Sequence, residues 1–318
     1  MYQLLWIFFI YTFLGWCTEV SYVALLKGKF VNRGFLNGPA CPIYGFGVVL
    51  VLSLLSPLKD SKLLLFFGSV ALTSLLEFLT GFVLEKIFGQ RWWDYSDEPF
   101  NLGGYICLRF SIGWGLACMF VVYLLHPTVL LFIRLIPRTL GILLLALMGC
   151  TMAVDLAATV RTITNLNRHL SQIDELAAKI KEMSNDIGEN LADRVLDAAE
   201  KGADLKEELE EHTERLIERA EDWKEDLDVW KYSLDRKRET LQDELEERAE
   251  LRLQRHQARS AQLQAELTQL RVRLEEMLEH RTFGQDRLMR AFPKMRSAHH
   301  QQALERLRQR RNALKRPK

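Results

Sequence analysis

The sequence predicts an all-α protein: a polytopic membrane helix bundle of about five spans, followed by a long soluble coiled-coil helix. Charge is divided unequally along the chain. Residues 1–160 contain only ten of the 42 Lys and Arg residues and eight of the 41 Asp and Glu residues. Beyond that point, apolar residues recur at spacings of three and four among charged ones. We therefore expect a membrane domain (1–160), a cytoplasmic coiled coil (161–290) and a basic tail (291–318).

Apolar stretches near the length of about 20 residues that a bilayer span requires are the first predicted elements. They are Leu4–Leu26, Pro42–Leu58, Leu63–Leu84, Leu102–Leu125 and Leu140–Val160. A further apolar piece, Thr128–Ile136, is too short to span alone, and we expect it to be interfacial or re-entrant. A count of six spans is the alternative. The aromatic-rich first stretch has no basic segment before it, which indicates a retained anchor.

The distribution of basic residues favours a cytoplasmic C-terminus. With the tail inside, the inner connections carry seven Lys and Arg residues and the outer ones carry four. This bias follows the positive-inside rule. The charged second half gives a stronger reason, because such a domain is most simply left in the cytoplasm. We expect a multi-pass protein of the cell (plasma) membrane.

The second half has the spacing of a coiled-coil seam. The seam runs through residues 205–234, with Trp223 and Trp230 one heptad apart. Gly188 and Gly202 are where we expect a bend or a hairpin. The partner strand is either a second copy of the chain or the same chain folded back. A solvated single helix held by i,i+4 ion pairs is the alternative.

The end of the chain is basic. Residues 294–318 contain nine Lys and Arg residues and one acid, Glu305. This composition suits binding to anionic lipid headgroups, and a disordered solubilising end is the alternative. No motif that reads a nucleic-acid groove is present, so we do not expect nucleic acid as a partner.

Ionisable residues in or near the apolar spans are the first candidates for a functional site, because a charge at membrane depth is unfavourable. They are Glu19, Glu77, Arg109 and Asp155. The third and fourth spans are joined by a short connection, so we expect Glu77 and Arg109 to lie at similar depth and to form an ion pair. That pair either fixes helix packing or takes part in function.

Two connections that are dense in glycine and proline supply further candidates. The first contains NRGFLNGP (32–39) and PIYG (42–45), and the second contains WWDYS (92–96) and NLGGYICLR (101–109). Their donors and acceptors lie beside aromatic residues, as in a polar ligand site. An aromatic belt is the alternative for the tryptophans. The predicted substrate-binding residues are Glu19, Arg33, Glu77, Asp94, Tyr95, Asn101 and Arg109.

These residues carry a resemblance to a known family. Gly15-Trp16 with Glu19, the NRGFLNGP–PIYG stretch, Leu76-Glu77 and the WDYS–P–N–G–CL–S–WG stretch are similar to the bacterial membrane proteins called ABC-transporter type IV, the CmpB-type permease domain. The resemblance covers roughly residues 1–155 and implies a permease-like subunit. The chain has no GxxxxGK[ST] motif, so an ATPase would be a separate subunit.

Three functions are open from the sequence. One is a permease-like transporter subunit whose polar core contacts a substrate and whose coiled coil binds partners. The second is a non-transport membrane scaffold. The third is a membrane enzyme that uses Glu19, Glu77 or Asp94 as acid or base on a lipid-like substrate. No His precedes His126 and no GxSxG is present, so we expect no metal, no cofactor and no catalytic residue. The expected partners are membrane lipids, an ATPase subunit, and a second copy or another protein on the coiled coil.

Overall fold

The structure is a computed structural model that describes the chain apart from residues 221–250, 252–253, 256, 281–283 and 316–318. The chain divides into two compact units. The first unit consists of Met1–Gln172 together with Glu279–Lys318, and the second is Ile173–Leu278. Segments from the two ends of the sequence therefore belong to one unit.

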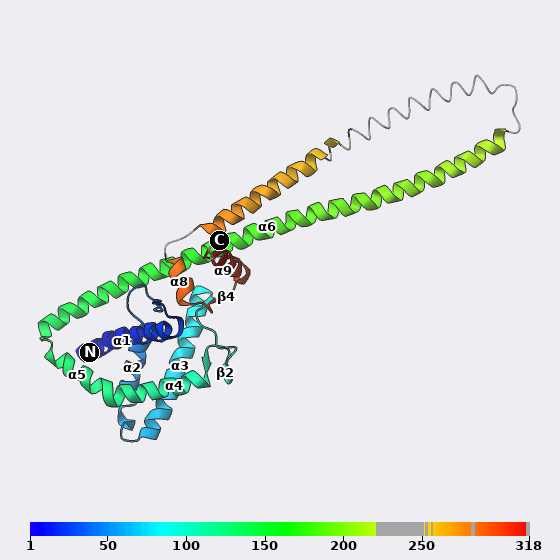
Figure 1. Cartoon of the computed structure of the whole chain (residues 1–318). Coiled ribbons are helices and arrows are strands. Elements are labelled where there is room, and N and C mark those ends of the chain that lie inside the picture. The colour runs from blue at the N-terminus through cyan, green and yellow to red at the C-terminus, as the bar shows by residue number, and fades with distance from the viewer. Residues whose placement is uncertain (221–250, 252–253, 256, 281–283, 316–318) are drawn as a thin grey trace. The chain divides into compact units, whose positions relative to one another are not determined.

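Helices dominate the first unit (Figure 1). Its helices are α1 (Tyr2–Lys27), α2 (Pro42–Leu54), α3 (Lys62–Phe88), α4 (Leu108–Phe120), α5 (His126–Leu135), the first part of α6 (Arg138–Ala220), α8 (Gln285–Ala291) and α9 (Gln301–Lys315). Two-residue strands form two antiparallel pairs: β1 (Gln90–Arg91) with β4 (Arg296–Ser297), and β2 (Asn101–Leu102) with β3 (Ile106–Cys107). A 3₁₀ turn at Ser56–Leu58 follows α2.

Four helical segments in the described part of the chain are long and apolar enough to cross a membrane. They are Tyr2–Lys27, Lys62–Phe88, Leu108–Leu135 and Arg138–Glu189, and α2 is a shorter apolar helix. The prediction of an all-α fold with a membrane helix bundle is confirmed. The prediction that Thr128–Ile136 is a separate interfacial or re-entrant piece is wrong. A π-helical turn, Val121–Leu125, joins α4 to α5, and this wider turn precedes Pro127, which lacks an amide hydrogen, so the helix continues.

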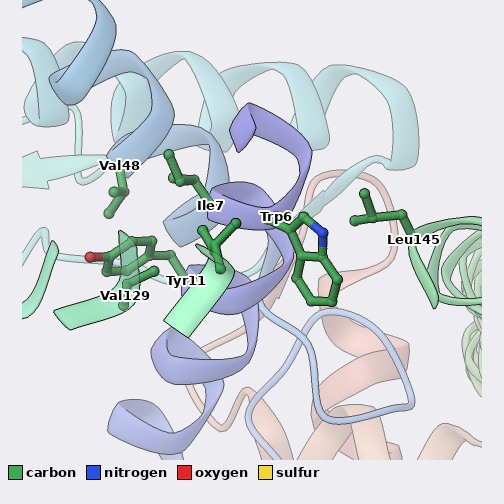
Figure 2. Close-up of a cluster of buried hydrophobic side chains, with 7 residues drawn as sticks. Trp6, Ile7, Tyr11, Val48, Val129 and Leu145 are labelled. Carbon is green, nitrogen blue, oxygen red and sulfur yellow. The ribbon is translucent and has the colours of Figure 1, made fainter. Parts of the chain in front are cut away.

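The core of the bundle gathers side chains from α1, α2, α5 and α6. Figure 2 shows Trp6 of α1 facing Leu145 of α6, while Tyr11 lies beside Val48 and Val129. These side chains are all buried. In a bilayer, such a cluster stabilises the bundle mainly through close van der Waals packing of its side chains.

Two glycines end the helices that precede the candidate loops. Gly28 follows α1 and Gly89 follows α3, with φ angles of 63° and 62°. Each amide donates back to the helix, to the carbonyls of Ala24 and Glu85. This left-handed cap is accessible to glycine at little cost. It terminates both helices at the points where the polar loops begin.

The helix α6 continues from the bundle into the second unit. It is unbroken through Gly188 and Gly202, so the predicted bend or hairpin at these positions is wrong. A glycine inside a helix costs only about 1 kcal/mol relative to alanine, which a long helix tolerates. Residues 257–279 are also helical. Trp223 and Trp230 lie outside the described residues.

The C-terminal part of the first unit is folded. In α9, Ala303, Leu304 and Leu307 are fully buried, and β4, which precedes α9, pairs with β1. A Cβ atom on Gly284, just before α8, would touch Thr162 of α6. The disordered alternative for the basic tail therefore does not hold for Gln301–Lys315.

Candidate functional site

Two carboxylates inside the bundle each accept a hydrogen bond from a tyrosine. The Tyr44 hydroxyl on α2 donates to Glu19 Oε1 on α1 at 2.6 Å. The Tyr95 hydroxyl, from the β1–β2 connection, donates to Glu77 Oε1 on α3 at 3.2 Å. The charge of Glu19 acts on both Glu77 and Tyr95, so the two pairs form one cluster. We call Glu19, Tyr44, Glu77 and Tyr95 the carboxylate–tyrosine cluster.

Close packing of α1 against α2 places Tyr44 on Glu19. A Cβ atom on Gly15 would overlap the Tyr44 ring, and one on Gly45 would overlap the Thr12 hydroxyl. Only glycine permits this approach of the two helices. Since Gly15 lies one turn before Glu19, the Tyr44 hydroxyl comes within hydrogen-bonding distance of the carboxylate.

The two carboxylates of the cluster differ in their charge partners. Arg33 Nε lies 3.3 Å from Glu19 Oε2. In the described part of the chain, no Lys or Arg forms an ion pair with Glu77, whose side chain is 9% exposed. Its Oε2 is buried without a hydrogen bond of ordinary geometry, and the Trp114 side chain is a neighbouring donor. The arginine of the cluster therefore pairs with Glu19 only, and Glu77, buried without a described counter-ion, favours binding of a positive charge.

Aromatic rings surround the cluster. The Tyr44 ring packs edge-on against the Trp114 indole with centroids 5.4 Å apart, and the Tyr95 ring stacks on Phe110 at 4.9 Å. Aromatic faces beside carboxylates suit an organic cation, since a ring attracts positive charge. The sequence analysis missed Tyr44 and Trp114 as site residues. Both lie within the stretches that carry the family resemblance, and that was the available signal.

Arg109 does not belong to the cluster. Its side chain is 75% exposed and its Nη1 lies 3.8 Å from Glu98 Oε2. The predicted ion pair between Glu77 and Arg109 is therefore wrong. The helix α4 begins at Leu108, so Arg109 lies in its first turn, whereas Glu77 lies about three turns from the end of α3. The two residues are at different depths.

The loop of residues 28–41, here called the N-loop, is fixed by side-chain contacts to its backbone. Asp155 on α6 accepts hydrogen bonds from the Asn37 amide at 2.9 Å and from the Gly38 amide at 2.7 Å. The Asn32 side chain accepts from Trp16 Nε1 at 2.8 Å and donates to the Asn37 carbonyl at 2.7 Å. These contacts hold the loop that carries Arg33. They also account for an aspartate within an apolar span.

The loop of residues 89–107, here called the Trp-loop, folds around Asp94, which is 4% exposed. Its Oδ1 accepts from the amide and hydroxyl of Ser96. Its Oδ2 lies 2.9 Å from Arg296 Nε. Burial alone would raise the pKa of Asp94, but the Ser96 hydrogen bonds and the charges of Arg296 and Arg91 hold that pKa below its ordinary value.

The remaining polar residues of the Trp-loop serve its own turns. The Asn101 side chain donates to the Glu98 carbonyl at 2.8 Å and accepts from the Gly104 amide at 3.1 Å. Trp92 is buried, and Trp93 Nε1 donates to the Tyr105 carbonyl. The indoles therefore have contacts within the protein. Of the predicted site residues, the structure brings together Glu19, Arg33, Glu77 and Tyr95, and it places Asp94 and Asn101 in the adjoining loop.

The membrane-length helices are those of a polytopic membrane protein. The model of the family described as "Putative ABC-transporter type IV" matches residues 6–160, so this part of the chain is similar to that family. The predicted resemblance is confirmed. No curated protein and no solved structure matches the chain. Among the described residues, no group of three His, Cys, Asp or Glu side chains is arranged to hold a metal ion.

Proposed function

We propose that the chain is a permease-like membrane subunit whose carboxylate–tyrosine cluster binds a cationic group of a transported or regulatory small molecule. The observation that carries this proposal is Glu77: it is buried and bonded to Tyr95, and no described Lys or Arg pairs with it. A carboxylate in that setting needs a positive charge or a proton to be stable. The neighbouring aromatic rings favour an organic ammonium.

The proposal extends to the surroundings of this subunit. A separate ATPase supplies energy to a transporter of this class when the permease chain has no nucleotide-binding motif, and we expect such a partner here. The subunit resides in the cell membrane with its C-terminal part in the cytoplasm. Its second unit associates with another copy or with a protein partner.

The test is ligand-dependent stabilisation of the full-length protein in lipid nanodiscs. Ammonium, tetramethylammonium, guanidinium, Na⁺ and K⁺ are added at constant ionic strength, and the thermal unfolding midpoint is measured for wild type and for Glu77→Gln. A ligand at 100 times its Kd stabilises a protein by about 2.7 kcal/mol, which is measurable as a raised midpoint. We expect an organic ammonium to raise the midpoint of the wild type and not that of Glu77→Gln.

The matched control is Glu98→Gln. Glu98 is a carboxylate outside the cluster, and it pairs with Arg109, whose side chain is largely exposed. This variant should keep the ligand response of the wild type. Absence of a response to every cation, or an equal response in Glu77→Gln, contradicts the proposal.

A further inference from the structure

A segment near the C-terminus contacts both loops of the site. We call residues 284–300, which include α8 and β4, the return segment, because they lie in the first unit although the second unit precedes them in the sequence. Arg287 on α8 donates from Nη1 to the carbonyls of Gly34 and Leu36 at 2.8 and 2.9 Å. Its Nη2 donates to the Phe35 carbonyl at 3.0 Å. One guanidinium thus binds three successive carbonyls of the N-loop.

The same segment binds the Trp-loop through a second arginine. Arg296 Nε lies 2.9 Å from Asp94 Oδ2. Around this ion pair, β4 pairs antiparallel with β1, with Ser297 opposite Gln90. The Ala298 amide also donates to the Gly89 carbonyl at 2.9 Å. The start of the Trp-loop is therefore a strand partner of the return segment.

An aromatic contact joins all three segments. The buried Trp92 indole packs edge-on against Phe35 of the N-loop at 5.3 Å and against Phe292 of the return segment at 5.1 Å. Leu288 and Met295 of the return segment are fully buried. Such burial gives the segment a defined position, which loose charge pairing at a surface would not.

We infer that Arg287 and Arg296 are positioning residues of the carboxylate–tyrosine cluster. Arg287 holds the carbonyl of Gly34, the residue next to Arg33, which pairs with Glu19. Arg296 holds Asp94, the residue next to Tyr95, which bonds Glu77. Arg287 thus holds the backbone, and Arg296 a side chain, at the residue next to one polar contact of the cluster. The consequence of this inference rests on the proposed function: when the cluster binds a cation, the return segment sets the affinity of the cluster for that cation.

Both passages of the chain between the units contact the Trp-loop. The chain leaves the first unit after Gln172 and re-enters it at Glu279. On the outgoing side, the Asn167 side chain donates to the Phe88 carbonyl at 2.6 Å and accepts from the Gln90 side chain at 2.8 Å. On the incoming side, the return segment binds both loops.

The experiment is hydrogen–deuterium exchange on the full-length protein in nanodiscs, with amides that report on each loop. The Gly34 amide donates to Asn32 Oδ1 and reports on the N-loop; the Tyr95 amide donates to the Gly104 carbonyl and reports on the Trp-loop. Arg287→Ala should speed exchange at Gly34 by about tenfold or more and leave Tyr95 within about twofold. Arg296→Ala should show the reverse pattern. In the ligand assay, both variants should weaken cation affinity by about tenfold.

The matched control is Arg290→Ala on the same helix, because Arg290 Nε donates only to the Asp286 carbonyl one turn earlier in the described contacts. It should leave both amides and the affinity unchanged. Arg287→Lys should restore part of the protection, and it serves as the readout if Arg287→Ala does not fold. Unchanged exchange in both loops, or faster exchange with unchanged cation affinity, overturns the inference. If no cation binds the wild type, the proposed function fails while the crossed exchange pattern still tests the positioning of the loops.

Discussion

Three carboxylates in apolar helices of this protein are stabilised in three different ways. Glu19 has an arginine and a tyrosine, Glu77 has a tyrosine and no described arginine or lysine, and Asp155 has backbone amides of the N-loop. A carboxylate that accepts several N–H groups needs no counter-ion, because oriented dipoles stabilise its charge. Asp155 therefore serves the structure of the N-loop, and Glu77 is the carboxylate to which we assign the proposed ligand.

Asp94 gives a pH-dependent prediction. Its folded pKa lies below the ordinary value of 3.8. Its contribution to stability is therefore fully present above pH 3.8 and is lost as the pH falls through the lower folded value. We expect Asp94→Asn to reduce the free energy of unfolding by about 1–3 kcal/mol at pH 7, since a buried charge-assisted pair is broken. The difference in free energy of unfolding between the wild type and Asp94→Asn, measured by chemical unfolding in detergent, should become smaller below pH 3.8.

Asp97→Asn is the control for that measurement. Asp97 is 79% exposed and lies 3.4 Å from Lys294, and such surface pairs contribute about 0–1 kcal/mol. Its removal should change stability little at either pH. If Asp94→Asn lowers the free energy of unfolding by the same amount at pH 3 and at pH 7, Asp94 does not act as a charged group.

At the scale of the elements, two glycines determine how α1 meets α2. We expect Gly15→Ala to displace Tyr44 from Glu19, because the added methyl group would overlap the tyrosine ring. Overpacking of this kind costs about 1–3 kcal/mol. The thermal unfolding midpoint should fall, and the cation response of the cluster should weaken. Gly149→Ala is the control, since nothing lies within 4 Å of a Cβ atom there; unchanged behaviour of both variants would contradict the packing argument.

The sequence predicted the helical elements well because hydropathy reports directly on the solvent around each segment. It did not predict which side chains pair, because the length of an apolar stretch gives neither the first residue of the helix nor the direction in which each residue faces. Arg109 shows the uncertainty in the first residue of a helix. The apolar stretch begins at Leu102, but β2 and β3 come first and α4 begins only at Leu108. Gly202 shows that a residue type that often ends helices does not end every one.

The role of Arg287 was beyond sequence reasoning for a different reason. Its partners, the carbonyls of residues 34–36, are about 250 positions away along the chain and are backbone atoms, which leave no side-chain pattern. By contrast, Glu19 and Glu77 were predicted because charged groups in apolar spans are conspicuous. Arg33 and Tyr95 were predicted from the two connections that are dense in glycine and proline.

At the scale of the whole molecule, the topology of the bundle depends on whether α2 crosses the membrane. The helix α2 has 13 residues, about 20 Å of helix against a hydrocarbon core of about 30 Å. The apolar residues around the following 3₁₀ turn would have to complete the crossing. We expect a reporter fused after Lys318 to be cytoplasmic and one inserted at Asp60 to be external, as the basic residues of the connections favour. Cytoplasmic signals at both positions would mean that α2 does not cross.

The contact of the return segment with both loops also imposes an order on biosynthesis. At about 5–20 residues per second, the roughly 120 residues between the membrane half and Arg287 take about 6–24 s to synthesise. During that interval the bundle is already complete in sequence, but the carbonyls of residues 34–36 and the carboxylate of Asp94 lack their arginine partners. The nascent chain therefore passes through a stage in which neither loop has its arginine contact. A chain that ends before Arg287 would keep both loops in that unfinished state.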